Sequence, residues 1–151
     1  MIAQQISVFA ENRPGRLATI TAALAKGKIN IRATTIATSD TFGVINLLVD
    51  KPLEAQQALT TAGFMVQVRN VLAVEIGDQP GALDTLTQLL SNTGINVNNA
   101  YGFVVESCKR AIFVVDVDQA EKAEAILAKN GFKTLDTEEL SSVEPFHYTK
   151  Y

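Results

Sequence analysis

Two short segments of the chain combine residue types that can hold a small molecule carrying both a carboxylate and an ammonium group. The first loop, residues 12–17 (Asn-Arg-Pro-Gly-Arg-Leu), and the second loop, residues 78–83 (Asp-Gln-Pro-Gly-Ala-Leu), each precede an apolar stripe of helical period. Glycine lets a ligand approach the backbone, and the N–H groups of a helix N-terminus behind it suit a carboxylate. The Asn or Asp of each loop, with Asn30 and Asn96, offers oxygen acceptors for an ammonium.

Each of these features also has a plainer structural interpretation. The loop Asn or Asp can cap a helix, the Pro-Gly pairs can turn the chain, and the other two asparagines can bond nearby backbone. Arg13 and Arg16 occur only in the first loop, where they either clamp a carboxylate or lie in solvent. For any one residue we prefer the plainer interpretation, and for the two loops together we prefer ligand binding.

The two loops are parts of an internal repeat. The second loop follows the first at a spacing of 66 residues, and at this spacing Asn30 matches Asn96 and Val49-Asp50 matches Val115-Asp116. Beyond that point the spacing is 68, which predicts two extra residues in the second copy, before or within its second helix. A match that persists so far indicates two folding units of one design. We expect these units at residues 1–69 and 70–140, with a tail at 141–151.

Within the first copy the sequence predicts six elements. They are a strand at 5–10, a helix capped by Asn12 with Pro14 in its first turn, strands at 29–36 and 43–49, a helix from Pro52 to Gly63, and a strand at 64–68. We expect Leu17, Ile20 and Leu24 to form the apolar stripe of the first helix. From the second helix, Leu53 and Leu59 should face inward.

The order βαββαβ is that of the split βαβ arrangement, in which two helices cover one face of a four-stranded antiparallel sheet. We therefore predict an α+β protein of two tandem ferredoxin-like units. Only Arg69-Asn70 separates the last strand of one copy from the first strand of the next, without a Gly/Ser linker. The two units should therefore pack together.

Charge and composition exclude several classes of function. Sixteen acidic and thirteen basic residues give a formal charge of −3, without the cationic field that nucleic acids require of a partner. No stretch approaches the roughly 20 apolar residues of a membrane span, and the N-terminus lacks signal-peptide features, so we expect a cytoplasmic protein without a membrane partner. Cys108, the sole cysteine, excludes an intramolecular disulfide and should be a partly buried filler.

Signs of catalysis are weak. His147, the sole histidine, lies in the tail, where we expect a surface or docking role. The sequence has no phosphate loop, His-Glu-x-x-His pair or dinucleotide glycine motif. Glu121, Glu124, Glu138 and Glu139 lie on or beside the last helix, which indicates solvated helix charge. We therefore expect no enzyme, no metal and no cofactor.

The motif Asn/Asp-x-Pro-Gly-x-Leu after a first strand, with Ile-Asn-Ile/Val opening the second strand, resembles the ACT domain. It occurs twice in register, in the two loops and around Asn30 and Asn96. The first copy, from Ile6-Ser7-Val8 onward, is also similar to the ACT domain of the acetolactate synthase regulatory subunit, whereas residues 70–140 depart from the remainder of that subunit. The whole chain resembles the stand-alone tandem ACT proteins, which carry no catalytic domain.

This resemblance implies an amino-acid-binding, allosteric regulator. In that family the ligand binds at interfaces between ACT units, between the strand-to-helix loop of one unit and a strand of its neighbour. The matching positions are Asn12, Arg13, Pro14, Gly15, Arg16, Leu17, Asn30, Ile31, Asp78, Gln79, Pro80, Gly81, Ala82, Leu83, Asn96 and Val97. We expect a free amino acid as ligand, a homodimer with paired sheet edges, and a metabolic enzyme as target. The alternatives are an assembly module without a ligand and a small ferredoxin-like enzyme.

Overall fold

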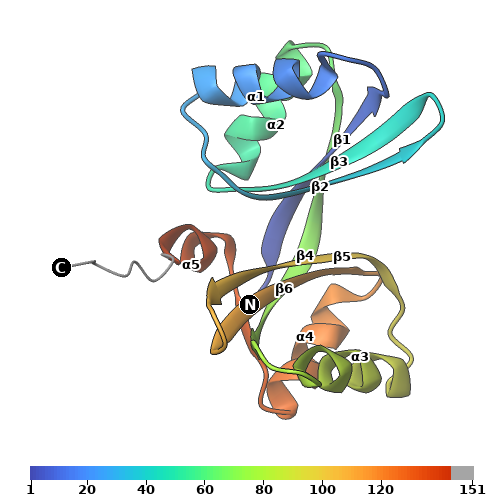
Figure 1. The fold of residues 1–151 in the computed structure, drawn as a ribbon, viewed down its shortest axis with the longest axis vertical. Coiled ribbons are helices and arrows are strands. Elements are labelled where there is room, and N and C mark those ends of the chain that lie inside the picture. Colours follow the sequence, from blue (N-terminus) through green and yellow to red (C-terminus); the bar gives the residue numbers. More distant parts are fainter. Residues whose placement is uncertain (144–151) are drawn as a thin grey trace. The chain divides into compact units, whose positions relative to one another are not determined.

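The computed structural model describes residues 1–143 and shows the predicted order of strands and helices twice (Figure 1). Contacts divide the chain into a first unit, Gln4–Arg69, and a second unit formed by Met1–Ala3 with the described residues from Asn70 onward. The first residues join the second unit because the Met1 amino group pairs with the Glu124 carboxylate and donates to the Thr134 hydroxyl at 2.8 Å.

The first unit is a four-stranded sheet with two helices. Its elements are β1 (Ala3–Glu11), α1 (Arg16–Lys26), β2 (Ile31–Ser39), β3 (Phe42–Val49), α2 (Pro52–Thr61) and the start of β4 (Met65–Gly77). The strand order is β2-β3-β1-β4, and β3 pairs antiparallel with both of its neighbours. Both helices lie on one face of this sheet (Figure 1). β2 is therefore an edge strand within its own unit.

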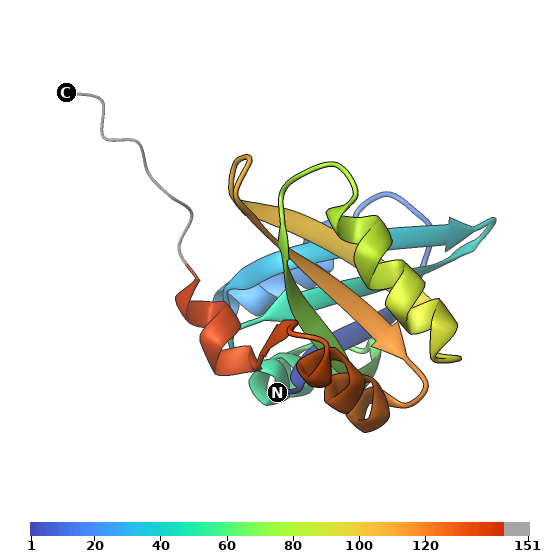
Figure 2. The same ribbon diagram turned by 90° about the horizontal axis from the view of Figure 1, so that it is seen from below.

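The second unit repeats this plan. Its elements are the end of β4, α3 (Ala82–Asn92), β5 (Val97–Glu106), β6 (Arg110–Val117), α4 (Ala120–Lys129), β7 (Lys133–Leu135) and α5 (Thr137–Ser142). The strand order β7-β4-β6-β5 is the counterpart of the order in the first unit. Figure 2 shows α5, in red, as a separate short helix after β7. The predicted α+β class and the two βαββαβ units are confirmed.

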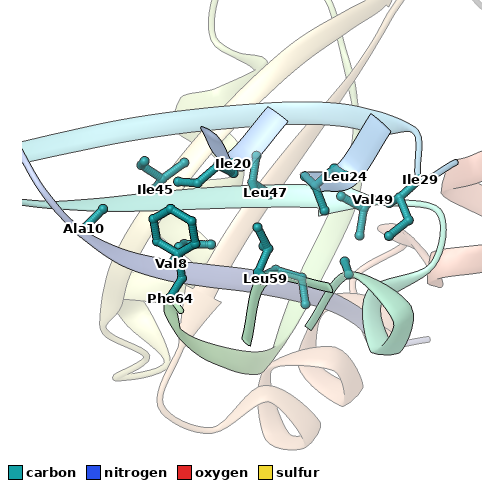
Figure 3. Packing of buried hydrophobic residues seen from close by; sticks show 12 residues of the cluster. Val8, Ala10, Ile20, Leu24, Ile29, Ile45, Leu47, Val49, Leu59 and Phe64 are labelled. Atoms are coloured by element: carbon teal, nitrogen blue, oxygen red, sulfur yellow. The ribbon is translucent and has the colours of Figure 1, made fainter. Parts of the chain in front are cut away.

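Strand alternation builds the core of each unit. In β1 the side chains of Ile6, Val8 and Ala10 point toward the helices, where they meet Ile20 and Leu24 of α1. Figure 3 shows this cluster. The second core repeats it with the following residues: Leu72, Val74, Leu86, Leu90, Ile95, Val115, Val117, Ala120, Ala123 and Leu127. The apolar periodicity of the sequence thus predicts both cores.

The helix starts differ from the prediction. α1 begins at Arg16 and α3 at Ala82, and their N-cap residues are Gly15 and Gly81, without a side-chain cap. The prediction that Asn12 caps a helix is therefore wrong, and Pro14 precedes the helix instead of lying in its first turn. The reason is that the Asn12 side chain donates to a carbonyl in the turn between β2 and β3 instead.

Two predictions about burial are also wrong. Leu53 is 65% exposed, because α2 turns Pro52, Ala55 and Leu59 toward the core instead. Cys108 is exposed and does not fill the core, since it lies in the turn between β5 and β6 with a φ of 62°. Glu138 and Glu139 belong to α5, where Glu139 forms a capping box with Asp136.

The two extra residues of the second copy lie in its hairpin, not before or within its second helix. Ile6 pairs with Leu47 across β1 and β3, whereas Leu72, 66 residues after Ile6, pairs with Val115, 68 residues after Leu47. The β5–β6 ladder contains a register shift between Val104 and Glu106, and its turn is longer than the β2–β3 turn. The spacing therefore changes ahead of β6, and the structural counterpart of Val49 is Val117.

Two absences concern only the part of the chain that the structure describes. Residues 1–143 contain no helix long and apolar enough to cross a membrane. In the same range, His, Cys, Asp and Glu side chains form no group of three or more that could ligate a metal. His147 lies outside the described residues.

Candidate functional site

The two loops follow the same backbone course up to the helices behind them. Gly15 has φ 87° and ψ −12°, and Gly81 has φ 89° and ψ −14°, values in the left-handed region that glycine adopts without strain. The carbonyl of Gly15 accepts from the backbone N–H and the hydroxyl of Thr19, and Thr85 bonds to Gly81 in the same way. Glycine is thus required at both positions by the turn itself.

The first loop is attached to the turn of its own hairpin. The Asn12 backbone N–H donates to the Thr41 carbonyl at 2.8 Å, and its side-chain Nδ2 donates to the Asp40 carbonyl at 3.0 Å. The Arg13 guanidinium pairs with the Glu11 carboxylate at 2.8 Å on the surface. Since Nδ2 of Asn12 is used by the turn, its Oδ1 is the acceptor left for another group.

This attachment encloses a pocket of about 130 Å³ between the first loop, the start of α1 and the ends of three strands. Its lining residues are Ala10, Glu11, Asn12, Arg13, Arg16, Leu17, Ile36, Thr38, Gly43 and Ile45. Asn12, Arg13, Arg16 and Leu17 were predicted from the loop motif. Leu17, predicted as part of the core stripe, is 41% exposed and borders this pocket.

The strand residues of the pocket were not predicted. Ile36 pairs with Ile45, and Thr38 pairs with Gly43, so two rungs of the β2–β3 ladder supply them. The sequence indicates these residues only through the alternation of side chains along β2 and β3, which places them on one face of the sheet. The pairing of Glu11 with Phe42 and the hydrogen bonds of the first loop to the hairpin turn show that this end of the ladder meets the loop.

Arg16 is the more buried of the two arginines that line the pocket. Its guanidinium carbon lies 4.7 Å from the centre of the Phe64 ring, a cation–π distance that holds the planar group in place. Its Nε atom is buried and has no hydrogen-bond partner within residues 1–143. Arg16 also lines the pocket, where its planar guanidinium can donate hydrogen bonds to a carboxylate.

The second loop has different chemistry. Asp78 accepts from the Cys108 backbone N–H at 2.6 Å, and Gln79 donates to the Cys108 carbonyl at 3.3 Å. Ala82 takes the place of Arg16 in the matching position. The polar groups of this loop therefore bond to their own hairpin, and no arginine stands at the start of the helix.

Asn30 and Asn96 do not meet the loops of their own units. The Asn30 backbone N–H donates to the Asp50 carboxylate at 2.9 Å, and the Asn96 side chain donates to the side-chain oxygen of Asn98 at 3.0 Å. α1, at about 1.5 Å per residue over 11 residues, carries the chain about 16 Å from one end of the sheet to the other. In Figure 3, Ala10 and Phe64 mark one end of the core and Ile29 the other.

The other predicted positions lie outside the pocket. Ile31 and Val97 pack against the apolar core of their own units. Pro14, Gln79, Pro80 and Gly81 are exposed. Leu83 is 41% exposed, like Leu17 in the first copy.

A second, more open pocket of about 390 Å³ lies in the second unit and was not predicted. Its charged residues have both signs: Glu75, Glu106, Lys109, Arg110 and Lys133. Glu106 and Lys109 pair with each other. The electrostatic field in this pocket is therefore neither uniformly positive nor uniformly negative.

Two βαββαβ units that share one strand, each with a Pro-Gly loop before its first helix, define a tandem ferredoxin-like protein. Residues 1–144 match the family model described as an ACT domain pair. The chain therefore belongs to the ACT domain pair family. No curated protein matches the sequence.

Solved structures with the same architecture include a near relative and more distant ones. Protein BT0572 from Bacteroides thetaiotaomicron is 31% identical, with a TM-score of 0.87 over 94% of this chain and 97% of that one. The ligand-free regulatory subunit of aspartate kinase from Thermus thermophilus is 20% identical, with a TM-score of 0.62 over 87% and 97% of the two chains. None of these relatives tests the likeness to the acetolactate synthase regulatory subunit, which stays a prediction.

Proposed function

We propose that this protein is a non-catalytic regulator that binds a free amino acid at a strand-to-helix loop. The observation that carries the proposal is the first-loop pocket, which is lined by the Arg16 cation together with Asn12 and Glu11. Membership of the ACT domain pair family supports it, as does the shared fold of a chain described as a regulatory subunit of aspartate kinase.

The pocket offers a partner for each end of an amino acid. The ligand carboxylate takes the hydrogen bond of the Arg16 guanidinium, which the Phe64 ring holds in position. The ammonium faces Oδ1 of Asn12 and the Glu11 carboxylate, both of which line the pocket. In the family pattern a strand of a neighbouring unit completes the site, and Asn30-Ile31 or Asn96-Val97 supplies that strand here.

Regulation follows from differential binding. A ligand held between the first loop and the hairpin stabilises the conformation in which they contact each other, and it shifts the population toward that state. The affected partner is a metabolic enzyme, and the protein acts as a cytoplasmic homodimer. The edge strand β2, which pairs only with β3 within its own unit, supplies a surface for such pairing.

Thermal unfolding with each of the twenty L-amino acids at about 10 mM tests the proposal. A ligand present at about 100 times its Kd adds about 2.7 kcal/mol to the free energy of unfolding. At about 2–4 °C per kcal/mol, the Tm should rise by about 5–11 °C for the cognate amino acid. Its D-enantiomer, which presents the same groups with the opposite hand, is the control and should give a much smaller shift.

A chain that remains folded and dimeric, but shows no shift with any amino acid, would contradict this proposal. The assembly module without a ligand would then be the better interpretation.

A further inference from the structure

The two copies differ at the positions that line the pocket of the first unit. Ile36 pairs with Ile45 in the first hairpin, and the matching pair in the second hairpin is Gly102 and Phe113. A Cβ atom on Gly102 would lie 2.9 Å from the Phe113 ring. The Phe113 ring therefore lies against the Gly102 backbone, where Ile36 has its own side chain in the first copy, and only glycine leaves room for the ring there.

Both loops bond to their own hairpin turn, Asn12 in the first and Asp78 in the second, so the polar difference between the copies lies in the helix start. In the second loop, one oxygen of Asp78 and the amide nitrogen of Gln79 both bond to the backbone of Cys108. The longer turn between β5 and β6 brings that residue within reach. Arg16 lines the first pocket as a cation, whereas Ala82 stands at the matching position of the second loop.

The size and lining of the first pocket limit the ligand. A cavity of about 150 Å³ accommodates benzene, so a pocket of about 130 Å³ suits a molecule with a small side chain. Ala10, Leu17, Ile36 and Ile45 give it aliphatic walls. A charged ligand side chain would lose hydration against these walls without a matching partner.

From these differences we infer that the first unit alone binds the ligand, and that the ligand is a small aliphatic amino acid with its carboxylate on Arg16. This inference rests on the proposed function and deepens it. The second unit keeps the loop and the glycine turn, but it has Ala82 in place of Arg16 and the Gly102–Phe113 pair in place of the two isoleucines that line the first pocket. The chain thus carries one loop with an arginine for the ligand carboxylate and one loop without it.

Isothermal titration of the full chain with L-alanine, L-valine, L-leucine and L-isoleucine tests the inference. At least one of them should bind with no more than one ligand per chain, and its carboxamide should not bind detectably. Arg16→Gln should weaken the Kd about 10–100-fold, the effect of losing a hydrogen bond between charged groups. Arg16→Lys, which retains the charge without the planar fork, should bind with intermediate affinity.

Two further variants separate the copies. Asp78→Asn alters only the second loop and should leave the Kd unchanged. The double substitution Ile36→Gly with Ile45→Phe copies the Gly102–Phe113 pair into the first unit, where it replaces both isoleucine walls of the pocket and should weaken the Kd at least tenfold. Because the second unit already accommodates this pair, the double variant should fold, and its far-UV circular dichroism should match that of the parent chain.

The outcomes distinguish this inference from the proposed function. Two ligands per chain, or a Kd that responds to Asp78→Asn and not to Arg16→Gln, would overturn the single site but leave amino-acid binding intact. Binding of a polar or charged amino acid in place of the four aliphatic ones would overturn the ligand class. If none of the twenty amino acids binds, both the inference and the proposed function fail.

Discussion

Replacing Gly15 or Gly81 by alanine isolates the contribution of the loop backbone. A Cβ atom at either position would meet no heavy atom within 4 Å, so the substitution causes no clash. The two φ angles, 87° and 89°, are nearly equal. The whole effect should therefore come from forcing an L-residue into the left-handed region, and it should be the same at both sites.

The magnitude follows from two opposing terms. The left-handed conformation costs an L-residue about 1–2 kcal/mol, and the upper value applies because both φ angles lie about 30° beyond the ideal of about 57°. Alanine also reduces the conformational entropy of the unfolded chain, which offsets about 0.4–1 kcal/mol. The net loss is about 1–1.5 kcal/mol, or about 2–6 °C in Tm for a chain of this length.

Thermal unfolding followed by far-UV circular dichroism measures the loss, and asparagine is the matched control. Because asparagine tolerates the left-handed region better than alanine does, Gly15→Asn and Gly81→Asn should lose about half as much. Equal losses for alanine and asparagine, or a loss below about 0.5 kcal/mol for alanine, would refute the backbone argument. A much larger loss at one site than at the other would also contradict the argument, because it would require a steric clash where no heavy atom lies within 4 Å of the Cβ.

Two further predictions concern the second unit. Asp78→Ala removes the acceptor of the Cys108 backbone N–H. Because this hydrogen bond is charge-assisted but partly solvated, its loss should lower the free energy of unfolding, measured in urea, by about 1 kcal/mol. Asp78→Asn, which keeps an oxygen at this position, should lower it less. Burial raises the pKa of the Tyr101 phenol, and the Asp116 carboxylate raises it further. Since an unfolded tyrosine releases its proton first, near pH 10, stability should fall above that pH, and Tyr101→Phe should reduce this fall in urea titrations from pH 9 to 11.

The fold was predictable because its determinants are periodic and local. Alternation in β1 and the stripe of Ile20 and Leu24 specify which face of each element is buried, and the repeat confirms each element a second time. The errors fell where tertiary contacts outweigh local preference. Asn12 is a good N-cap residue by type, but the hairpin turn offers its side chain a carbonyl, and Gly15 therefore becomes the cap.

The site was predictable only in part. The loop motif identified Arg16 and Leu17 directly, whereas Ile36 and Ile45 lie in a hairpin whose sequence shows only alternating strand residues. Their role depends on which end of the ladder meets the first loop, a property of the sheet order and not of any local segment. The direction of α1 likewise separates Asn30 from the loop within its own unit, and no motif spacing indicates that separation.

The repeat explains why the two copies can differ without a loss of fold. The buried strand positions, such as Ile6 and Leu72, keep their apolar character because each must fill a core beneath two helices. The paired strand residues of the hairpins near the loops can vary more in side-chain size. The Ile36–Ile45 pair and the Gly102–Phe113 pair both fit the same backbone pairing between strands. Two residues added to the second hairpin therefore change the chemistry beside the loop while the βαββαβ plan is retained.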